Sequence, residues 1–150
     1  MPDNIRIMYK RELQKIPVFG WCLKMSPYIA VDRERSREAS DVLEGVVDTM
    51  STGSSVLVFP EGTRSPDGTL GPFRRGVVAI AVRSGTPVVP VALIGTAAIL
   101  PARTNRLSGG DVQLVIHAPL SVGGERTPQE EKALVGRLRS IIQETITLQP

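Results

Sequence analysis

The stretch VLVFPEGTRS, residues 56–65, carries the strongest structural signal in the sequence. Its apolar half predicts a buried strand over residues 55–59. Its second half begins a loop over residues 60–72 that is rich in Gly, Pro and Ser. In α/β folds, ligands bind just beyond the carboxyl ends of buried strands. The stretch therefore predicts a sheet strand followed directly by a ligand site.

Strands and helices are expected to alternate on both sides of this stretch. Strands are predicted at residues 5–8, 28–31, 88–94 and 112–116, and helices at residues 18–25, 36–50, 75–83 and 127–147, with a helical turn at 97–100. Gly85 suits a helix C-terminus, and Thr127 with Glu130 forms a capping box. The alternation predicts a single α/β domain, a sheet flanked by helices. Whether some edge strands pair antiparallel stays open.

Bulk composition narrows the functional class. The 150 residues are 41% hydrophobic and 22% charged, which is ordinary for one globular domain with a real core. A net charge of +3 suits an anionic substrate or an anionic membrane surface. Nucleic acid is not expected as a partner, because no basic stripe interleaved with aromatic residues appears.

The sequence also bears on location. It contains no apolar run of eighteen residues and no signal-peptide pattern, so we expect neither a transmembrane helix nor export. The one cysteine, Cys22, excludes an internal disulfide and is compatible with a reducing compartment. We expect Cys22 to be a buried small residue.

Four consecutive polar or small residues form the candidate site. Arg64 offers a planar fork that matches two phosphate oxygens. Gly62 lets a ligand approach the backbone closely, and Thr63 adds a hydroxyl and a backbone donor. Glu61 could orient the arginine or accept a hydrogen bond from a substrate hydroxyl. An alternative is a surface ion pair between Glu61 and Arg64, which would contribute only about 0–1 kcal/mol.

The string Phe-Pro-Glu-Gly-Thr-Arg-Ser at residues 59–65 resembles the third sequence block of the glycerolipid acyltransferases, of the lysophosphatidic acid acyltransferase type. Other segments agree in order and spacing. Lys10-Arg11-Glu12-Leu13, Ile16-Pro17 and Gly20-Trp21 are similar to the family's Lys-x-Glu-Leu, Ile-Pro and Gly-Trp elements. Residues 28–33 resemble its second block, and residues 73–76 and 85–91 the stretch that ends in its fourth. The resemblance runs from about Ile5 to Leu120.

This resemblance implies a substrate and a reaction. It implies that Arg64, with Glu61, Gly62 and Thr63, binds the phosphate of an acylglycerol phosphate. Lys10 and Arg33 become candidate helpers, although a solvated charge at Lys10 and a salt bridge at Arg33 explain these residues as well. An acyl group would pass from the thioester of coenzyme A or acyl carrier protein to 1-acylglycerol-3-phosphate, giving phosphatidic acid. The resemblance implies no metal or other cofactor, and it implies a location on the cytoplasmic face of a membrane.

One departure from the family concerns the catalytic base. Family members carry a His-x-x-x-x-Asp block upstream of the matched residues, in which the His takes the proton of the attacking hydroxyl. The single histidine here is His117, with Val122 five residues on, and we expect it to be structural. We therefore expect an N-terminally truncated chain, residues 1–150 forming the C-terminal two-thirds of an acyltransferase domain. A non-catalytic lipid-phosphate binding protein and a membrane-surface interaction module remain alternatives.

The apolar residues 18–23 allow two interpretations. Flanked by Lys15 and Lys24, they could touch a membrane surface, or they could form a helix of the core.

Overall fold

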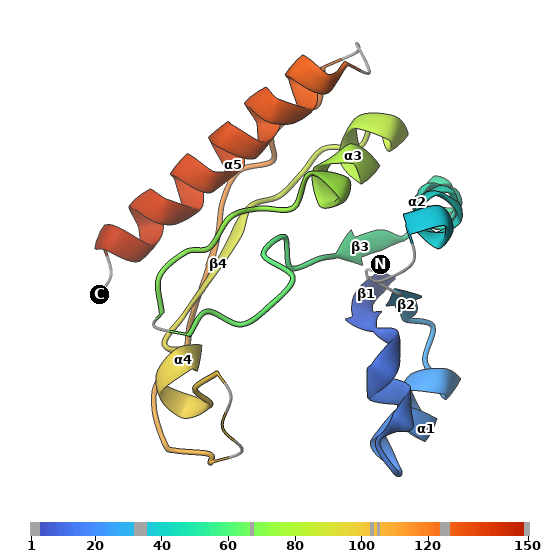
Figure 1. Cartoon of the computed structure of the whole chain (residues 1–150). Helices are drawn as coiled ribbons and strands as arrows, with labels where there is room; N and C mark the ends of the chain where they lie inside the picture. The colour runs from blue at the N-terminus through green and yellow to red at the C-terminus, as the bar shows by residue number, and fades with distance from the viewer. Residues whose placement is uncertain are drawn as a thin grey trace. The chain divides into compact units, whose positions relative to one another are not determined.

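The computed structural model describes residues 4–31, 36–66, 68–102, 104, 106–123 and 127–148. In chain order, the elements are β1 (Ile5–Lys10), the 3-10 helix η1 (Arg11–Lys15), α1 (Phe19–Met25), β2 (Ile29–Val31), α2 (Ser36–Ser51), β3 (Ser55–Leu57), α3 (Arg75–Ser84), β4 (Val91–Ile94), α4 (Thr96–Ile99), β5 (Gln113–Ile116) and α5 (Pro128–Leu148) (Figure 1). The expected alternation of strands and helices is confirmed. None of the helices in these ranges is long and apolar enough to span a bilayer.

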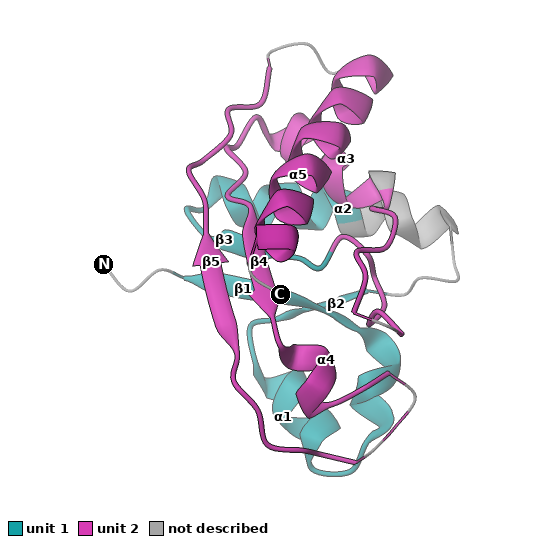
Figure 2. Cartoon of the chain, turned by 90° about the vertical axis from the view of Figure 1, so that its left-hand side faces the viewer, with its two compact units in different colours: residues 1–59 teal, residues 60–150 magenta. Residues whose placement is uncertain are grey.

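The chain forms two compact units, Met1–Phe59 and Pro60–Pro150 (Figure 2). The first unit contains a three-stranded sheet in the order β2-β1-β3. Both neighbours of β1 run parallel to it, with Met8 opposite Ile29 and Ile5 opposite Ser55. Parallel strands require crossover connections, and these are made by η1 with α1 and by α2.

Helix α1 is fixed to the first unit by one narrow face. Its buried residues are Gly20 and Leu23. A Cβ added at Gly20 would collide with the backbone of Gln14, so only glycine permits this approach of α1 to η1. Gln14 Nε2 donates to the Tyr9 hydroxyl at 2.7 Å, which ties η1 to β1. Cys22 is exposed, so its expected burial is wrong, because the inward face of this short helix is already occupied.

The second unit is built around two helices and an antiparallel strand pair. β4 and β5 pair with Val91 opposite Ile116 and Ile94 opposite Gln113, which answers the question of antiparallel pairing that the sequence left open. The core joins α3, α5 and the end of the preceding loop, and its buried members are Phe73, Val78, Ala81, Val82, Leu134 and Leu138.

The expected glycine ends α3, and one of the two hydrogen bonds of the expected capping box is found at the start of α5. Gly85 follows α3 with φ 67° and donates its N–H to the carbonyl of Ala81 at 2.9 Å. The Glu130 N–H donates to the Thr127 hydroxyl at 3.2 Å, which caps α5.

Two strands are shorter than the sequence predicts. The buried strand expected over residues 55–59 ends at Leu57, and the side chains of Leu57 and Phe59 are 37% and 58% exposed. The chain turns at Pro60 instead of continuing the ladder, and a proline has no N–H to donate to one. The strand expected over residues 88–94 begins only at Val91, after Pro90, although Val88 still forms an isolated bridge to Leu120.

Candidate functional site

The segment that carries the predicted site residues is a closed loop of the second unit, residues 60–74. The N–H of Arg74 donates to the carbonyl of Pro60 at 2.9 Å, which joins the two ends of the loop. Phe73 is only 9% exposed and belongs to the core. Arg139 on α5 donates from Nη2 to the carbonyl of Leu70 at 3.0 Å. The 60–74 loop is thus held at its base by its own backbone, by the core and by α5.

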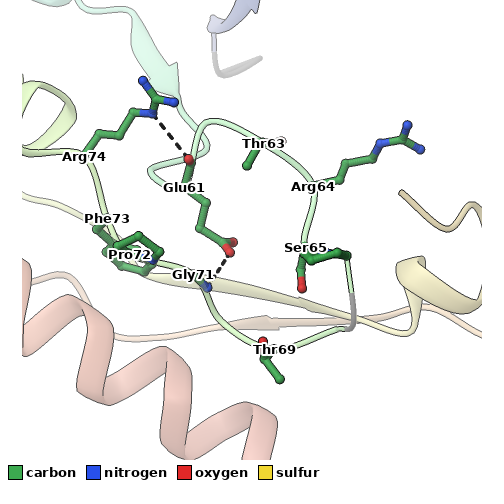
Figure 3. A pocket seen from close by; sticks show the side chains of 10 residues that line it. Glu61, Thr63, Arg64, Ser65, Thr69, Gly71, Pro72, Phe73 and Arg74 are labelled. Carbon is green, nitrogen blue, oxygen red and sulfur yellow. Dashed lines mark hydrogen bonds between the residues drawn. The ribbon is translucent and has the colours of Figure 1, made fainter. Parts of the chain in front are cut away.

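Glu61 spans the inside of this loop. Its Oε2 accepts a hydrogen bond from the N–H of Gly71 at 2.8 Å, and its backbone carbonyl lies 3.4 Å from Nε of Arg74 (Figure 3). The alternative of an ion pair between Glu61 and Arg64 is therefore wrong: the carboxylate is engaged across the loop, and Arg64 extends away from it. A role for Glu61 in substrate binding stays a prediction.

Arg64 is oriented by the end of α4. Its Nη1 lies 3.3 Å from the carbonyl oxygen of Leu100 and 3.4 Å from that of Pro101. These distances are long for N–H···O bonds, so the contacts are weak tethers. Both use the same nitrogen of a group that has five N–H donors in a fixed fork. The tethers thus aim the guanidinium while leaving donors on Nε and Nη2 that a ligand can use.

An open pocket of about 480 Å³ lies against the loop (Figure 3). Its lining residues are Glu61, Thr63, Arg64, Ser65, Pro66, Thr69, Gly71, Pro72, Phe73 and Arg74. The lining residues include two arginines, one glutamate and two threonines, an excess of one formal positive charge, and the two arginine side chains point away from each other (Figure 3). Such a lining favours a small anion that also carries hydrogen-bond acceptors.

Backbone conformation explains why a glycine follows Glu61. Gly62 has φ 70°, in the left-handed region where a side chain is strained. The conformation turns the chain between Glu61, which points into the loop, and Thr63, which lines the pocket. Gly62 is thus required by the local geometry, and its predicted contact with a ligand stays a prediction.

Arg74 is a pocket residue that the sequence reasoning did not single out. It lines the pocket and stands at the N-cap position of α3. The first turn of α3 contains no acidic residue, so the positive end of the helix dipole adds to the positive charge of the site. The sequence did contain a signal for Arg74, because it is a basic residue directly before a predicted helix. Its own charge and the positive end of the helix dipole are therefore expected at the same place.

The two predicted helpers are not placed at the pocket by the described contacts. Lys10 belongs to the first unit, where its Nζ lies 2.6 Å from Oε2 of Glu12 in an exposed ion pair. Arg33 lies outside the described residues. Their roles at the site stay predictions.

His117 makes a structural hydrogen bond. Its Nε2 lies 2.9 Å from the Thr145 hydroxyl, and that hydroxyl donates its only proton to the carbonyl of Ile141 at 2.8 Å. The side chain ties the end of β5 to α5, as expected of a structural histidine. In the part of the chain that the structure describes, no group of three or more His, Cys, Asp or Glu side chains is arranged to hold a metal ion.

Comparison with known proteins gives consistent matches. The profile of the family described as Acyltransferase matches residues 1–94. A chloroplast 1-acyl-sn-glycerol-3-phosphate acyltransferase of Brassica napus is 43% identical over 119 residues, covering 79% of this chain and 35% of the relative. A 1-acyl-sn-glycerol-3-phosphate acyltransferase of Pseudomonas aeruginosa is 37% identical over 138 residues, covering 91% of this chain and 53% of the relative.

A solved structure is similar over nearly the whole chain. The crystal structure of the 1-acyl-sn-glycerophosphate (LPA) acyltransferase PlsC from Thermotoga maritima matches with a TM-score of 0.78 at 29% identity. The match covers 96% of this chain and 56% of that protein. The chain thus spans about a third to a half of the length of the curated relatives given above.

Proposed function

This chain belongs to the acyltransferase family, and from that premise we propose that its 60–74 loop binds the phosphate of 1-acylglycerol-3-phosphate for acylation to phosphatidic acid. The acyl donor would be a thioester of coenzyme A or of acyl carrier protein. The acceptor hydroxyl oxygen bonds to the thioester carbonyl carbon, the carbon–sulfur bond breaks, and the hydroxyl proton ends on the released thiol. The relatives, which are 1-acyl-sn-glycerol-3-phosphate acyltransferases by name, support this acceptor.

The observation that carries the proposal is the placement of Arg64. Its guanidinium is held by two backbone carbonyls, and the residue lines a pocket whose other lining residues include Arg74, Thr63 and Thr69. A phosphate monoester presents planar pairs of oxygens to such a fork, whereas a neutral glyceride lacks this group. Phosphate binding at this loop would fix the distance from the loop to the acceptor hydroxyl, which is the positioning part of catalysis.

The proposal also covers two helper residues, the location of the protein and the source of the acyl donor. Lys10 and Arg33 are proposed to assist at the phosphate. We place the protein peripherally on the cytoplasmic face of a membrane, where its lipid acceptor resides, with acyl carrier protein as one source of the donor. A modest positive net charge supports contact with an anionic surface.

A second function is supported by a specific observation. His117 is hydrogen-bonded to Thr145 and does not line the pocket, and the carboxylate of Glu61 accepts from the N–H of Gly71, so neither is placed as a general base at the pocket. Binding without acyl transfer, as in a lipid-phosphate binding protein, is therefore the alternative. Turnover of a labelled acyl thioester with lysophosphatidic acid separates the two functions.

The binding site itself is tested by titrating glycerol 3-phosphate, a water-soluble ester, in a calorimeter. Arg64→Ala should lose most of the binding, on the order of 1.5–3 kcal/mol for charge-assisted hydrogen bonds. Arg64→Lys should recover only part of it, because a point charge cannot form the two-pronged contact. Arg83→Ala, at an exposed arginine outside the pocket, is the matched control. Equal binding by all the variants would overturn the assignment.

A further inference from the structure

Helix α1 presents an apolar face that the described residues leave uncovered. Val18, Trp21 and Met25 are 75%, 68% and 72% exposed. Trp21 and Met25 lie four residues apart on one side of α1, and Val18 stands at its N-cap, directly before the first helical turn. Ile16 and Phe19 beside them are also exposed. We call these five residues the α1 face.

The first unit holds this face outward. The opposite side of α1 is the one that is buried, through Gly20 and Leu23, so the helix cannot roll its apolar stripe inward without losing both contacts. Ser26 strengthens the arrangement by donating from its hydroxyl to the Leu23 carbonyl at 2.7 Å. The exposure of the stripe is therefore built into the way in which α1 is anchored.

The backbone that leads into α1 is strained at Val18. The N–H of Phe19 donates to the carbonyl of Pro17 at 2.7 Å, closing a γ-turn centred on Val18. Val18 has φ 63°, and it is the one non-glycine residue with positive φ in the described ranges. A β-branched residue in this region is a genuine outlier, and such strain is concentrated at functional positions. Burial of the Val18 side chain does not offset this strain, because the side chain is exposed to solvent.

Charge identifies the class of partner. Arg11, Lys15 and Lys24 are exposed in the segment that carries the α1 face; exposed Glu12 is paired with Lys10, and residues 13–31 contain no Asp or Glu. An apolar surface that includes a tryptophan and has an excess of cations beside it complements a surface that is apolar inside and anionic outside. The lysine stems can lie along apolar surface while their ammonium groups reach lipid phosphates. A protein partner would need a matching acidic rim around an apolar groove, whereas an anionic bilayer provides both everywhere.

We propose that the α1 face docks the chain on the surface of an anionic lipid bilayer, with Val18, Trp21 and Met25 entering the interface and Lys15 and Lys24 contacting lipid phosphates. The inference rests on the proposed membrane-surface location and names the face responsible for it. Tryptophan is enriched at bilayer interfaces because its ring is apolar and its N–H is polar.

Trp21 gives a direct readout, because it is the only tryptophan of the chain. Vesicles of phosphatidylcholine and phosphatidylglycerol in equal amounts should sediment the protein and shift its fluorescence to the blue. Vesicles of phosphatidylcholine alone should do both less. Brominated acyl chains should quench the fluorescence if the ring enters the bilayer. Rising salt should weaken the binding, since surface charges are screened over about 8 Å at physiological ionic strength.

Substitutions then assign the binding to the face. Val18→Gly removes an apolar side chain and suits the γ-turn, and Met25→Ser removes another from the same stripe. We expect each to weaken vesicle binding on the order of tenfold, given the gain from burying one such side chain. Lys15→Gln and Lys24→Gln should each weaken it about fivefold, on anionic vesicles only. The matched controls are Leu107→Ser, at an apolar residue equally exposed in the second unit, and Lys132→Gln on α5.

The possible outcomes separate the claims. Vesicle binding that the α1 variants leave unchanged would overturn the face and leave the membrane location standing. No vesicle binding by the unaltered chain would overturn both, while titration of glycerol 3-phosphate would still report on the Arg64 site. A concentration-dependent dimer that Val18→Gly and Met25→Ser dissociate would assign the face to a second copy of the chain, which also contradicts lipid docking.

Discussion

The 60–74 loop and the α1 face are both open to solvent, but they differ in what they present and in what holds them. The loop presents two arginines and is fixed by a buried aromatic, Phe73, and by a carboxylate bridge inside it. The α1 face presents apolar side chains and is fixed from behind by Gly20 and Leu23. A phosphate site needs donors at set positions, so its support must be rigid. A lipid surface needs contact area, so it tolerates changes of individual side chains.

This difference predicts that the largest loss of stability follows from a change at Phe73, the buried residue that anchors the 60–74 loop. Phe73→Ala should lower the free energy of unfolding by about 3–5 kcal/mol, because it opens a cavity in the core cluster. Phe19→Ala, the same substitution on the α1 face, should cost less than about 1 kcal/mol, because the ring is half exposed. Urea unfolding of both variants measures the two losses.

Binding assays extend this comparison. Phe73→Ala should also reduce binding of glycerol 3-phosphate per folded molecule, since the loop loses its anchor, whereas Phe19→Ala should leave that binding intact and weaken vesicle binding. If Phe73→Ala were to bind glycerol 3-phosphate normally, the idea that the core sets the geometry of the loop would be wrong.

A smaller loss of stability is expected at Gly62, the glycine at which the 60–74 loop turns. Gly62→Ala should destabilise the protein by roughly 1–2 kcal/mol, because an added Cβ is strained at φ 70°. Gly136→Ala provides the opposite case, at an exposed position in the interior of α5 where an added Cβ meets nothing within 4 Å. There alanine should stabilise by roughly 0.5–1 kcal/mol, since glycine is a poor helix residue.

Thermal unfolding of the two glycine variants checks these signs, and calorimetry checks binding. The loss of glycerol 3-phosphate binding in Gly62→Ala should exceed the loss explained by its unfolded fraction. Unchanged binding per folded molecule would make Gly62 a turn glycine with no part in the site.

The same contrast shows what the sequence could and could not predict. The helices were predictable because their periodicity and caps are local, as Gly85 and Thr127 illustrate. The polar loop after β3, which carries the candidate site, was predictable because a polar string follows an apolar strand. The partner of Glu61 was not, because Gly71 is ten residues away and closure of the loop brings it near. Loop closure also brings Arg74 to the pocket, which spacing alone did not reveal.

The outward orientation of α1 could not be derived from the sequence for a related reason. An apolar helix of this length fits a core as well as an interface, and composition does not separate the two. The decision depends on which of its sides Gly20 can bring against Gln14, which is a matter of tertiary contact. Long-range packing therefore determines both the partners inside the loop and the exposure of the α1 face.

The smallest effect is expected at His117, which lies in neither of the two regions compared here. His117→Ala should lower the free energy of unfolding by about 0.5–1.5 kcal/mol, the usual net contribution of one hydrogen bond. The cost should fall toward the lower end, because the Thr145 hydroxyl still donates to Ile141. Thr145→Val should lower the free energy of unfolding by a similar amount. The double variant should lose less stability than the two single variants added together, since both single changes remove the same contact.

Acyl transfer gives the sharper test of this residue. Positioned general bases contribute about 10²–10⁴-fold to the rate, so removing a true base would be unmistakable. Because His117 is hydrogen-bonded to a threonine on α5 and does not line the pocket, we expect His117→Ala to leave any turnover of a labelled acyl thioester with lysophosphatidic acid unchanged. Thr145→Val is the matched control, since it breaks the same hydrogen bond and leaves the imidazole in place. Turnover that His117→Ala abolishes and Thr145→Val preserves would make the histidine the base and would contradict its structural role.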